Sequence, residues 1–508
     1  MKKWSKAIVV GLCVCMIGTA ALAETEGVDA VSSAVQENED TQNQQMPPAM
    51  PGQQNQDGQD RQMPPPMPGQ QNQDGQNQQM PPAMPGQQKQ DGQNQQMPAD
   101  MSGQQNQDGQ NQQMPSGMPD MKGGRPEKPG EMNGMPGMQG GMGGPGGENA
   151  PADYDAANTV TESSTGASYV SSNDSENAVL VSQGNVTLSG SSVSKTGSSS
   201  SESADFYGIN AAVLARNGST LTIENAEITS DGGHANGVFS YGSGTTVNVS
   251  DTSIITSGNN SGGLMTTGGA AMNADNVTVS TSGNSSAAIR SDRGGGTVTV
   301  TGGRYDTTGV GSPAIYSTAD ITVSDADLSA ATSEAVVIEG GNSVTLRNVK
   351  ITGSNTKLNG QSTVNTNVLI YQSMSGDASE GASSFTMTDG SMTAETGAMF
   401  HVTNVTTTIN LENVDFTYAS DSNVFLDASA DAWGRTGENG GNVTLNLKSQ
   451  DITGAILSDS LSSVTLNLDA GSTWKLTGDS YVTEFNGDLS NVDMNGYTLY
   501  VNGTAVSR

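Results

Sequence analysis

A nine-residue pattern recurs along the C-terminal part of the chain and restricts the folds that it can adopt. In residues 343–351, with the sequence SVTLRNVKI, apolar residues alternate as in a β-strand on either side of Asn348. Four earlier copies keep this alternation and carry at the same break Asn225, Asp251, Gly302 or Asp325. Asn, Asp and Gly accept a left-handed backbone readily, so the break is predicted to be a one-residue corner. Strand pairs that return about every 25 residues predict a solenoid of stacked coils.

A third apolar segment precedes each of these strand pairs, so we expect three strands in every coil. These segments of three residues lie at 212–214, 237–239, 263–265, 287–289, 313–315 and 336–338. Stacked in parallel, their last residues are expected to form one inward column of Leu214, Phe239, Met265, Ile289, Ile315 and Ile338. The coil around Val277 and Val279 departs from the pattern, because residues 281–284 stand where its corner is expected.

The composition is too poor in apolar residues for several ordinary cores, with 33% apolar and 4% aromatic residues in a chain of 508. A solenoid needs only a few inward side chains per coil, because neighbouring coils complete the core. The net charge of -32 argues against nucleic acid and against an anionic membrane as partners, since both are negatively charged. Beyond residue 23, no stretch is long and apolar enough to span a bilayer as a transmembrane segment.

Residues 1–23 have the pattern of a secretory signal peptide. Three lysines among the first six residues precede an apolar run, and small residues end the segment at Ala23. We therefore predict a secreted, extracellular protein, with association to the cell surface as a further option. The two cysteines of the chain, Cys13 and Cys15, lie in this segment, so the mature protein is expected to hold neither a disulfide nor a thiolate metal site.

Residues 24–158 are predicted to be a disordered, low-complexity region rich in Gln, Pro, Met and Gly. Within residues 45–112 the tripeptide Gln-Met-Pro returns with a period of 17, starting at Gln45, Gln62, Gln79 and Gln96. Such a polar segment buries too little apolar surface to offset the entropy of ordering. From residue 159 to residue 508 the chain is dominated by Ser, Thr, Asn, Gly and Val, and it is predicted to form one β-domain.

The three-strand coils with Asn or Asp corners resemble the right-handed parallel β-helix of the pectin-lyase-like superfamily. Residues 288–296 (AIRSDRGGG), 311–320 (GSPAIYSTAD) and 333–340 (SEAVVIEG) are similar to motifs of secreted, adhesin-like β-helix proteins of Gram-positive anaerobes. The resemblance covers residues 159–508. It implies an all-β, single-stranded, right-handed parallel β-helix with three strands per coil. It says little about activity, because this fold hosts lyases, hydrolases, adhesins and phage tail spikes.

An outward strip on the first strand of each coil is the predicted place for ligand binding. If Leu214 and its counterparts point inward, the residue after each points outward, which gives the strip Ala215, Ser240, Thr266, Arg290, Tyr316, Glu339, Tyr371 and His401. Tyrosine rings can stack on sugars while charged groups pair with hydroxyls, so the strip suits a glycan. With the neighbouring Asp292 and Arg293, the candidate ligand-binding residues are Arg290, Asp292, Arg293, Tyr316, Glu339, Tyr371 and His401. The alternative is a set of ordinary solvated sheet positions.

Catalysis is the second option for the same face. The resemblance implies that a lyase would use clustered carboxylates to hold calcium and a basic residue to remove a proton, whereas a hydrolase would use grouped aspartates. No carboxylate trio recurs here at one strand position on neighbouring coils, so no catalytic residue is assigned. Asp320, Asp325 and Asp327 raise the option of calcium, but turn chemistry explains them, and no cofactor or metal is predicted.

These observations favour a secreted, adhesin-like, monomeric solenoid whose elongated surface binds a glycan or a host or cell-surface polymer without catalysis. Two alternatives remain open. One is a polysaccharide lyase or glycoside hydrolase of the same superfamily, and the other is a structural component of a surface or matrix. The identity of the ligand and the mode of attachment to the cell are not predicted.

Overall fold

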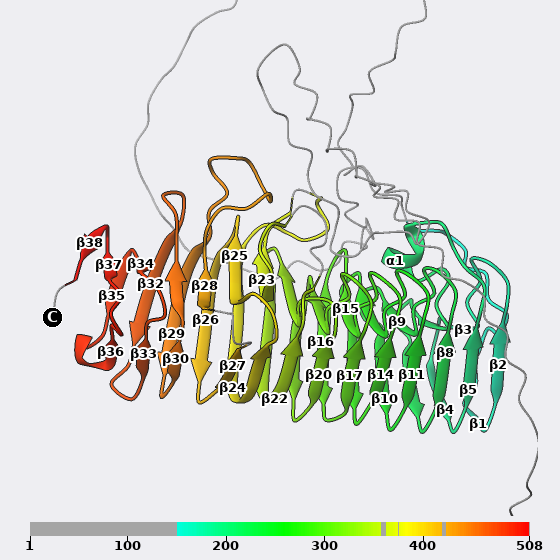
Figure 1. The fold of residues 1–508 in the computed structure, drawn as a ribbon. Coiled ribbons are helices and arrows are strands. Elements are labelled where there is room, and N and C mark those ends of the chain that lie inside the picture. The colour runs from blue at the N-terminus through cyan, green and yellow to red at the C-terminus, as the bar shows by residue number, and fades with distance from the viewer. Residues whose placement is uncertain (1–149, 357–361, 374, 419–422, 507–508) are drawn as a thin grey trace, which may run out of the picture. The chain divides into compact units, whose positions relative to one another are not determined.

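The computed structural model describes residues 150–506 apart from 357–361, 374 and 419–422 (Figure 1). The predicted signal segment, the 17-residue repeats and most of the region predicted to be disordered lie outside the described residues. The described part is all-β, as predicted, with long parallel sheets as in a solenoid. It contains one short α-helix, α1 (Ser203–Tyr207), and one 3-10 turn, η1 (Leu489–Asn491). The handedness of the coils and the family stay predictions.

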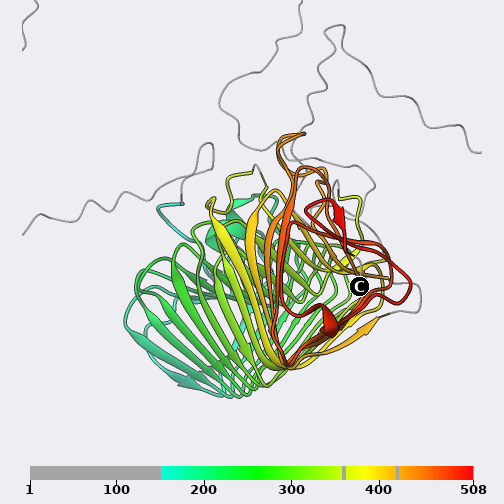
Figure 2. The same ribbon diagram turned by 90° about the vertical axis from the view of Figure 1, so that its left-hand side faces the viewer.

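A regular coil contributes three strands to two sheets. One coil consists of β6 (Val213–Ala215), β7 (Thr220–Glu224) and β8 (Glu227–Ser230). The first strand joins an 11-stranded sheet, and the other two join a 21-stranded sheet. Figure 1 shows the coils stacked in chain order from cyan to red, and Figure 2 shows the same coils turned by a quarter turn. Neighbouring strands pair in parallel and in register, as predicted.

The 11-stranded sheet contains β6 and ten further strands. They are β3 (Val179–Val181), β9 (Val238–Tyr241), β12 (Leu264–Thr267), β15 (Ile289–Ser291), β18 (Ile315–Ser317), β21 (Val336–Glu339), β23 (Thr366–Tyr371), β25 (Ala398–Thr403), β28 (Val424–Asp427) and β31 (Ala455–Leu457).

The 21-stranded sheet contains strands that precede the corner and strands that follow it. Those before the corner are β7, β1 (Ser164–Thr165), β4 (Asn185–Ser189), β10 (Thr246–Ser250), β13 (Ala270–Asp275), β16 (Gly296–Thr301), β19 (Asp320–Ser324), β26 (Thr406–Glu412), β29 (Asn442–Lys448), β32 (Ser463–Leu468) and β35 (Glu484–Asn486). Those after it are β8, β2 (Ser168–Ser171), β5 (Ser192–Lys195), β11 (Ser253–Thr256), β14 (Thr278–Thr281), β17 (Arg304–Thr307), β20 (Asp327–Ala330) and β27 (Asp415–Tyr418). Two long strands pass through the corner, β22 (Ser343–Gly353) and β24 (Ala382–Ala394).

Two small sheets lie at the C-terminal end of the stack. One contains β30 (Asp451–Thr453), β33 (Thr473–Lys475) and β36 (Val492–Asp493). The other contains β34 (Ser480–Val482), β37 (Leu499–Val501) and β38 (Thr504–Ala505). The pair β37–β38 is antiparallel, so the last strand turns back on the stack instead of starting another coil.

The predicted corners are confirmed. Asn348 has a φ of 50° and Asp325 a φ of 55°, both in the left-handed region. The corner side chains also bond from coil to coil, since Asn348 Nδ2 donates to Asp325 Oδ1 at 2.7 Å. The prediction of an irregular coil around Val277 was wrong. Asn276 is its corner, with a φ of 52° and a bond of 2.7 Å to Asp251 Oδ1, and Val277 follows the corner instead of preceding it.

Asn348→Ile is expected to lower the free energy of unfolding by about 1–2 kcal/mol, because a β-branched residue is strained in the left-handed region. Urea unfolding followed by circular dichroism measures the change. Asn348→Gly serves as the control, since glycine keeps the backbone conformation without strain. Equal stability of the isoleucine and glycine variants would contradict the role assigned to this corner.

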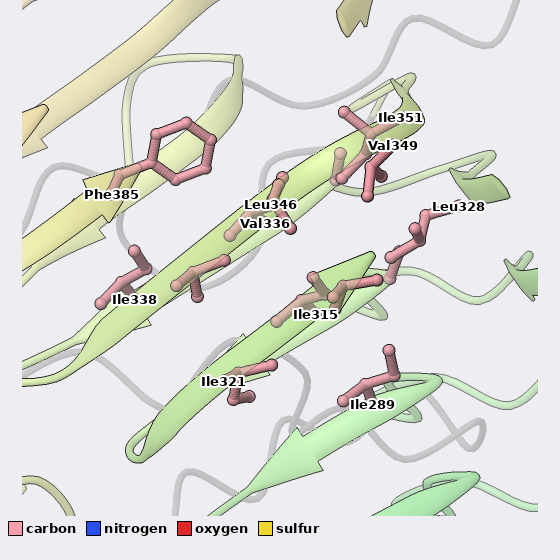
Figure 3. Packing of buried hydrophobic residues seen from close by; sticks show 14 of the residues in the cluster. Ile289, Ile315, Ile321, Leu328, Val336, Ile338, Leu346, Val349, Ile351 and Phe385 are labelled. Carbon is pink, nitrogen blue, oxygen red and sulfur yellow. The ribbon is translucent and has the colours of Figure 1, made fainter. Parts of the chain in front are cut away.

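Apolar residues from all three strands of a coil meet in the centre of the stack. Ile315 from β18, Ile321 from β19 and Leu328 from β20 are buried in one continuous cluster (Figure 3). In β22, the alternating apolar residues on both sides of Asn348 belong to the same cluster. Each fully buried aliphatic side chain stabilises the fold by roughly 1.5–3 kcal/mol, so these columns can hold together a chain with few aromatic residues.

Candidate functional site

The predicted outward strip does not lie on one face and is not exposed. Strand register places Leu214, Phe239, Met265, Arg290 and Tyr316 in one column of the 11-stranded sheet. This column faces away from the core, whereas Ala215 and its partners Ser240 and Thr266 are buried on the opposite side. The expected inward column was therefore wrong for its first three residues and right for Ile289, Ile315 and Ile338, which lie in the central cluster.

The error has a physical cause. The first strand of each coil is buried on both faces, so its residues read as a continuous apolar run and the alternation that would reveal their direction is missing. We call the side of the 11-stranded sheet that faces away from the core the covered face. All seven candidate ligand-binding residues lie on or beside the covered face. Six of them are buried, and Glu339, Tyr371 and His401 have 0% exposure. Only Arg293 is partly exposed.

Two aromatic contacts show what covers this face. Phe206 of α1 lies beneath the guanidinium group of Arg293, whose Cζ is 3.7 Å from the ring centroid. Trp433 lies in the segment between β28 and β29, and its ring centroid is 4.3 Å from that of Tyr371. Phe206, Trp433, Tyr316 and Tyr371 belong to one buried cluster, separate from the central one. The covered face is therefore a second, smaller core with polar groups inside it.

Two ion pairs lie in this small core. Arg290 Nη2 lies 2.9 Å from Asp292 Oδ2, and both side chains are almost fully buried. Arg293 Nε lies 2.5 Å from Asp377 Oδ1. Burial raises the pKa of Asp292 to about 7; Arg290 opposes this rise, whereas the charges of Asp377 and Asp205 add to it. Sequence reasoning missed Asp377 because it lies 84 residues from Arg293 in the chain.

Glu339 is held by hydroxyl groups instead of a cation. Tyr316 Oη donates to Glu339 Oε2 at 2.5 Å, and Tyr371 Oη donates to the same oxygen at 2.9 Å. Ser373 Oγ donates to Glu339 Oε1. Burial and the charge of Asp377 raise the pKa of Glu339, although the three hydroxyl donors oppose this rise. The two predicted tyrosines and Glu339 are thus brought together, but in a buried network and not on a surface.

His401 lies apart from these residues. Its Nδ1 is 3.0 Å from the carbonyl oxygen of Asp427, and its Nε2 is 3.5 Å from Asp431 Oδ2. Burial would raise the pKa of Asp431, but the nearby imidazole of His401 and hydrogen bonds from Thr363 outweigh this effect and hold the pKa well below its usual range. His401 therefore fixes the segment after β28 and is not placed as a base toward solvent.

Another charged contact joins α1 to the loops that precede β9 and β12. His234 Nδ1 lies 2.9 Å from Asp205 Oδ2, and its Nε2 lies 3.0 Å from Asn260 Nδ2. Burial opposes the charge on His234, but the charge and hydrogen bond of Asp205 prevail and raise its pKa. Among the described residues, no group of three or more His, Cys, Asp or Glu side chains is arranged to hold a metal ion.

The exposed side of the 21-stranded sheet offers a different candidate site. In the strands before the corner, one outward position carries Thr or Asn on every coil from β4 to β35. We call these residues the Thr/Asn column: Thr187, Thr222, Asn248, Asn273, Thr299, Thr322, Thr345, Thr386, Asn410, Asn446, Asn467 and Asn486. With strands about 4.8 Å apart, the column runs for roughly 50 Å across the sheet.

The two kinds of residue in the column differ in their hydrogen bonds. The asparagines bond to each other along the stack: Asn446 Nδ2 donates to Asn410 Oδ1 at 2.8 Å, and Asn467 Nδ2 donates to Asn446 Oδ1 at 2.7 Å. Within the described part of the chain, the hydroxyl groups of Thr299, Thr322 and Thr345 have no such partner. The middle of the column therefore presents free hydroxyl groups at the strand spacing.

A shallow hollow lies beside this middle part. Its volume is ≈ 350 Å³, and its polar lining comes from three neighbouring strands, with Asn248 and Ser250 of β10, Asn273 and Asp275 of β13, and Thr299 and Thr301 of β16. The hollow and the column together form an exposed polar surface that can exchange hydrogen bonds with a ligand. Its sequence signal is the residue between the two apolar positions of each strand before the corner, as in Val247-Asn248-Val249 and Val298-Thr299-Val300.

Comparisons of the chain with family models, with curated proteins and with solved structures found no match. No helix in the described ranges of the chain is long and apolar enough to cross a membrane. The class of protein that the structure defines is therefore an all-β protein of stacked parallel strands, with one sheet covered and the other open.

Proposed function

We propose that the chain is a secreted, adhesin-like protein that binds glycans on an elongated surface without catalysis. In this proposal the stack is a right-handed parallel β-helix of the pectin-lyase-like type, acts as a monomer and works outside the cell or at its surface. The signal-like segment at residues 1–23 and the net charge of -32 support an extracellular, soluble setting. The ligand is a glycan or another polymer of a host or cell surface.

One observation carries this proposal, the solvent-facing Thr/Asn column, in which Asn273, Thr299 and Asn486 are exposed and the other side chains are half-buried. Its side chains are hydroxyl and amide groups, which donate and accept hydrogen bonds and so match the hydroxyl groups of sugars. They repeat at a fixed spacing on a rigid sheet, which suits a polymer with repeated units. The covered face cannot fill this role in the described conformation, because Tyr316, Glu339 and Tyr371 are buried.

Thr299→Lys is expected to weaken binding of any glycan that the full-length protein retains on a glycan array, by about tenfold or more, because the long side chain fills the hollow and removes a free hydroxyl group. Ser280→Lys is the matched control. Ser280 is also exposed but lies in β14, after the corner. If both substitutions weaken binding equally, the site is not the Thr/Asn column.

A polysaccharide lyase or glycoside hydrolase is the second candidate. The observation that favours it is the pair Asp292 and Glu339, two carboxyl groups with raised pKa on one covered face, as a general acid requires. Both are fully buried, which favours a role in stability instead. Analysis of the bound polymer decides between the two, since shortened chains or unsaturated ends that vanish in Glu339→Gln would contradict binding without catalysis. An array without any bound glycan would favour a structural surface or matrix component.

A further inference from the structure

We propose that the surface around the Thr/Asn column selects uncharged polysaccharides and rejects polyuronates and sulfated glycans. This inference rests on the proposed function and adds the chemical class of the ligand. It follows from the charges of the residues that flank the column on its two sides and at the corner.

The column itself carries no charge in any of its twelve positions, Thr187 to Asn486. A binding site for an acidic polymer would need cations at the strand spacing, because arginine and lysine pair with carboxylate and sulfate groups. The free hydroxyl groups of Thr299, Thr322 and Thr345 instead offer neutral donors and acceptors. The centre of the surface therefore suits a neutral hydroxyl-rich chain.

The flanking positions are acidic. The two outward rows beside the column carry five carboxylates in register with it, Glu224, Asp275, Asp320, Glu412 and Glu484. The corner ladder adds Asp251, Asp325 and Asp389. Against these eight carboxylates stand two cations in the same rows, Arg347 and Lys448. Lys448 lies 2.7 Å from Glu412 Oε1, so these two charges offset each other, and seven carboxylates remain against one cation, Arg347.

This charge distribution acts along the whole path of a ligand. A polymer that follows the column runs across the strands. Because neighbouring strands are about 4.8 Å apart, successive sugar units lie close to successive coils. A polyuronate would bring a carboxylate to the acidic rows again and again. Like charges brought together repeatedly along the ligand oppose binding, and we expect them to lower the affinity by about tenfold or more at low salt. An uncharged chain avoids this repulsion.

The test uses the full-length protein on an array of matched polymer pairs that share a backbone and differ in charge. Cellulose oligomers are paired with carboxymethylcellulose, and methyl-esterified homogalacturonan is paired with its de-esterified form. We expect the neutral member of a bound pair to bind at least about tenfold more tightly, with the difference largest at low salt, where charges are least screened. Asp275→Asn is expected to narrow the difference, and the exposed Asp327→Asn, which lies after the corner, is expected to leave it unchanged.

The outcomes separate this inference from the function on which it rests. If no polymer binds, the proposed glycan-binding function fails and the inference falls with it. If polymers bind but acidic and neutral members bind equally, or acidic ones bind better, the function survives and the selectivity is wrong. Tighter binding of the neutral members, with a difference that Asp275→Asn narrows and Asp327→Asn does not, supports both the glycan-binding function and the selectivity.

Discussion

Arg290→Met is expected to lower the free energy of unfolding by about 3–5 kcal/mol at neutral to alkaline pH, because it leaves the buried Asp292 without its cation. The pKa of Asp292 is raised in the folded protein, so the folded state binds the proton more tightly than the unfolded state does. The contribution of Asp292 to stability is therefore full below about pH 4 and is lost as the pH rises to about 7. Arg290 opposes the rise in the pKa of Asp292, so without Arg290 the free energy of unfolding falls more steeply as the pH rises.

Urea unfolding of the variant at pH 5 and pH 8 measures this effect. The destabilisation is expected to be clearly larger at pH 8, where Asp292 must either stay charged in the small core or bind a proton at a cost. The double variant Arg290→Met/Asp292→Asn is the control and is expected to recover most of the stability at pH 8, because no buried charge remains. A loss that is the same at both pH values, and that Asp292→Asn does not repair, would contradict the assigned ion pair.

Phe400→Ala is expected to lower the free energy of unfolding by about 3–5 kcal/mol through the cavity that it leaves. Phe400 has 0% exposure, and its ring centroid lies 5.4 Å from that of Phe385 and 5.5 Å from that of Phe425. These rings belong to three neighbouring coils, so the substitution removes packing between coils as well as within one. Urea unfolding again measures the loss.

Ile255→Ala is the matched control, because Ile255 is also apolar but is 50% exposed on β11. It is expected to change the free energy of unfolding by no more than about 0.5 kcal/mol. If the two substitutions cost the same, the central cluster does not hold the coils together in the way described.

The sequence predicts the stack and its corners well, because these features depend on local rules. A corner needs a residue that accepts a positive φ, and the apolar residues around Asn348 alternate clearly because β22 is buried on one face only. Asn276 shows where the reasoning failed. Its coil has Met272 and Ala274 before the corner instead of two β-branched residues, so the strand signal there is weak and Val277 and Val279 look like the start of a strand pair.

The candidate site could not be predicted in the same way. Whether Arg290 or Tyr316 is exposed depends on α1 and on the segment with Trp433, which reach the sheet from distant parts of the chain. Local sequence carries no signal for such a cover. The Thr/Asn column does not stand out in the sequence, because Thr and Asn are ordinary residues on the solvated side of a strand. Only the register shows that they align on successive coils.

The central claim is that the 21-stranded sheet is open and binds the ligand, whereas the 11-stranded sheet is covered. The rate of maleimide labelling at single introduced cysteines tests this claim most directly. The measurement uses Thr299→Cys, Ser280→Cys and Val337→Cys in the full chain, with Cys13 and Cys15 replaced by serine. We expect fast labelling at positions 299 and 280, slow labelling at the buried position 337, and protection by a bound polysaccharide at position 299 alone. Fast labelling at position 337, or protection at position 280 and not at position 299, would contradict the account.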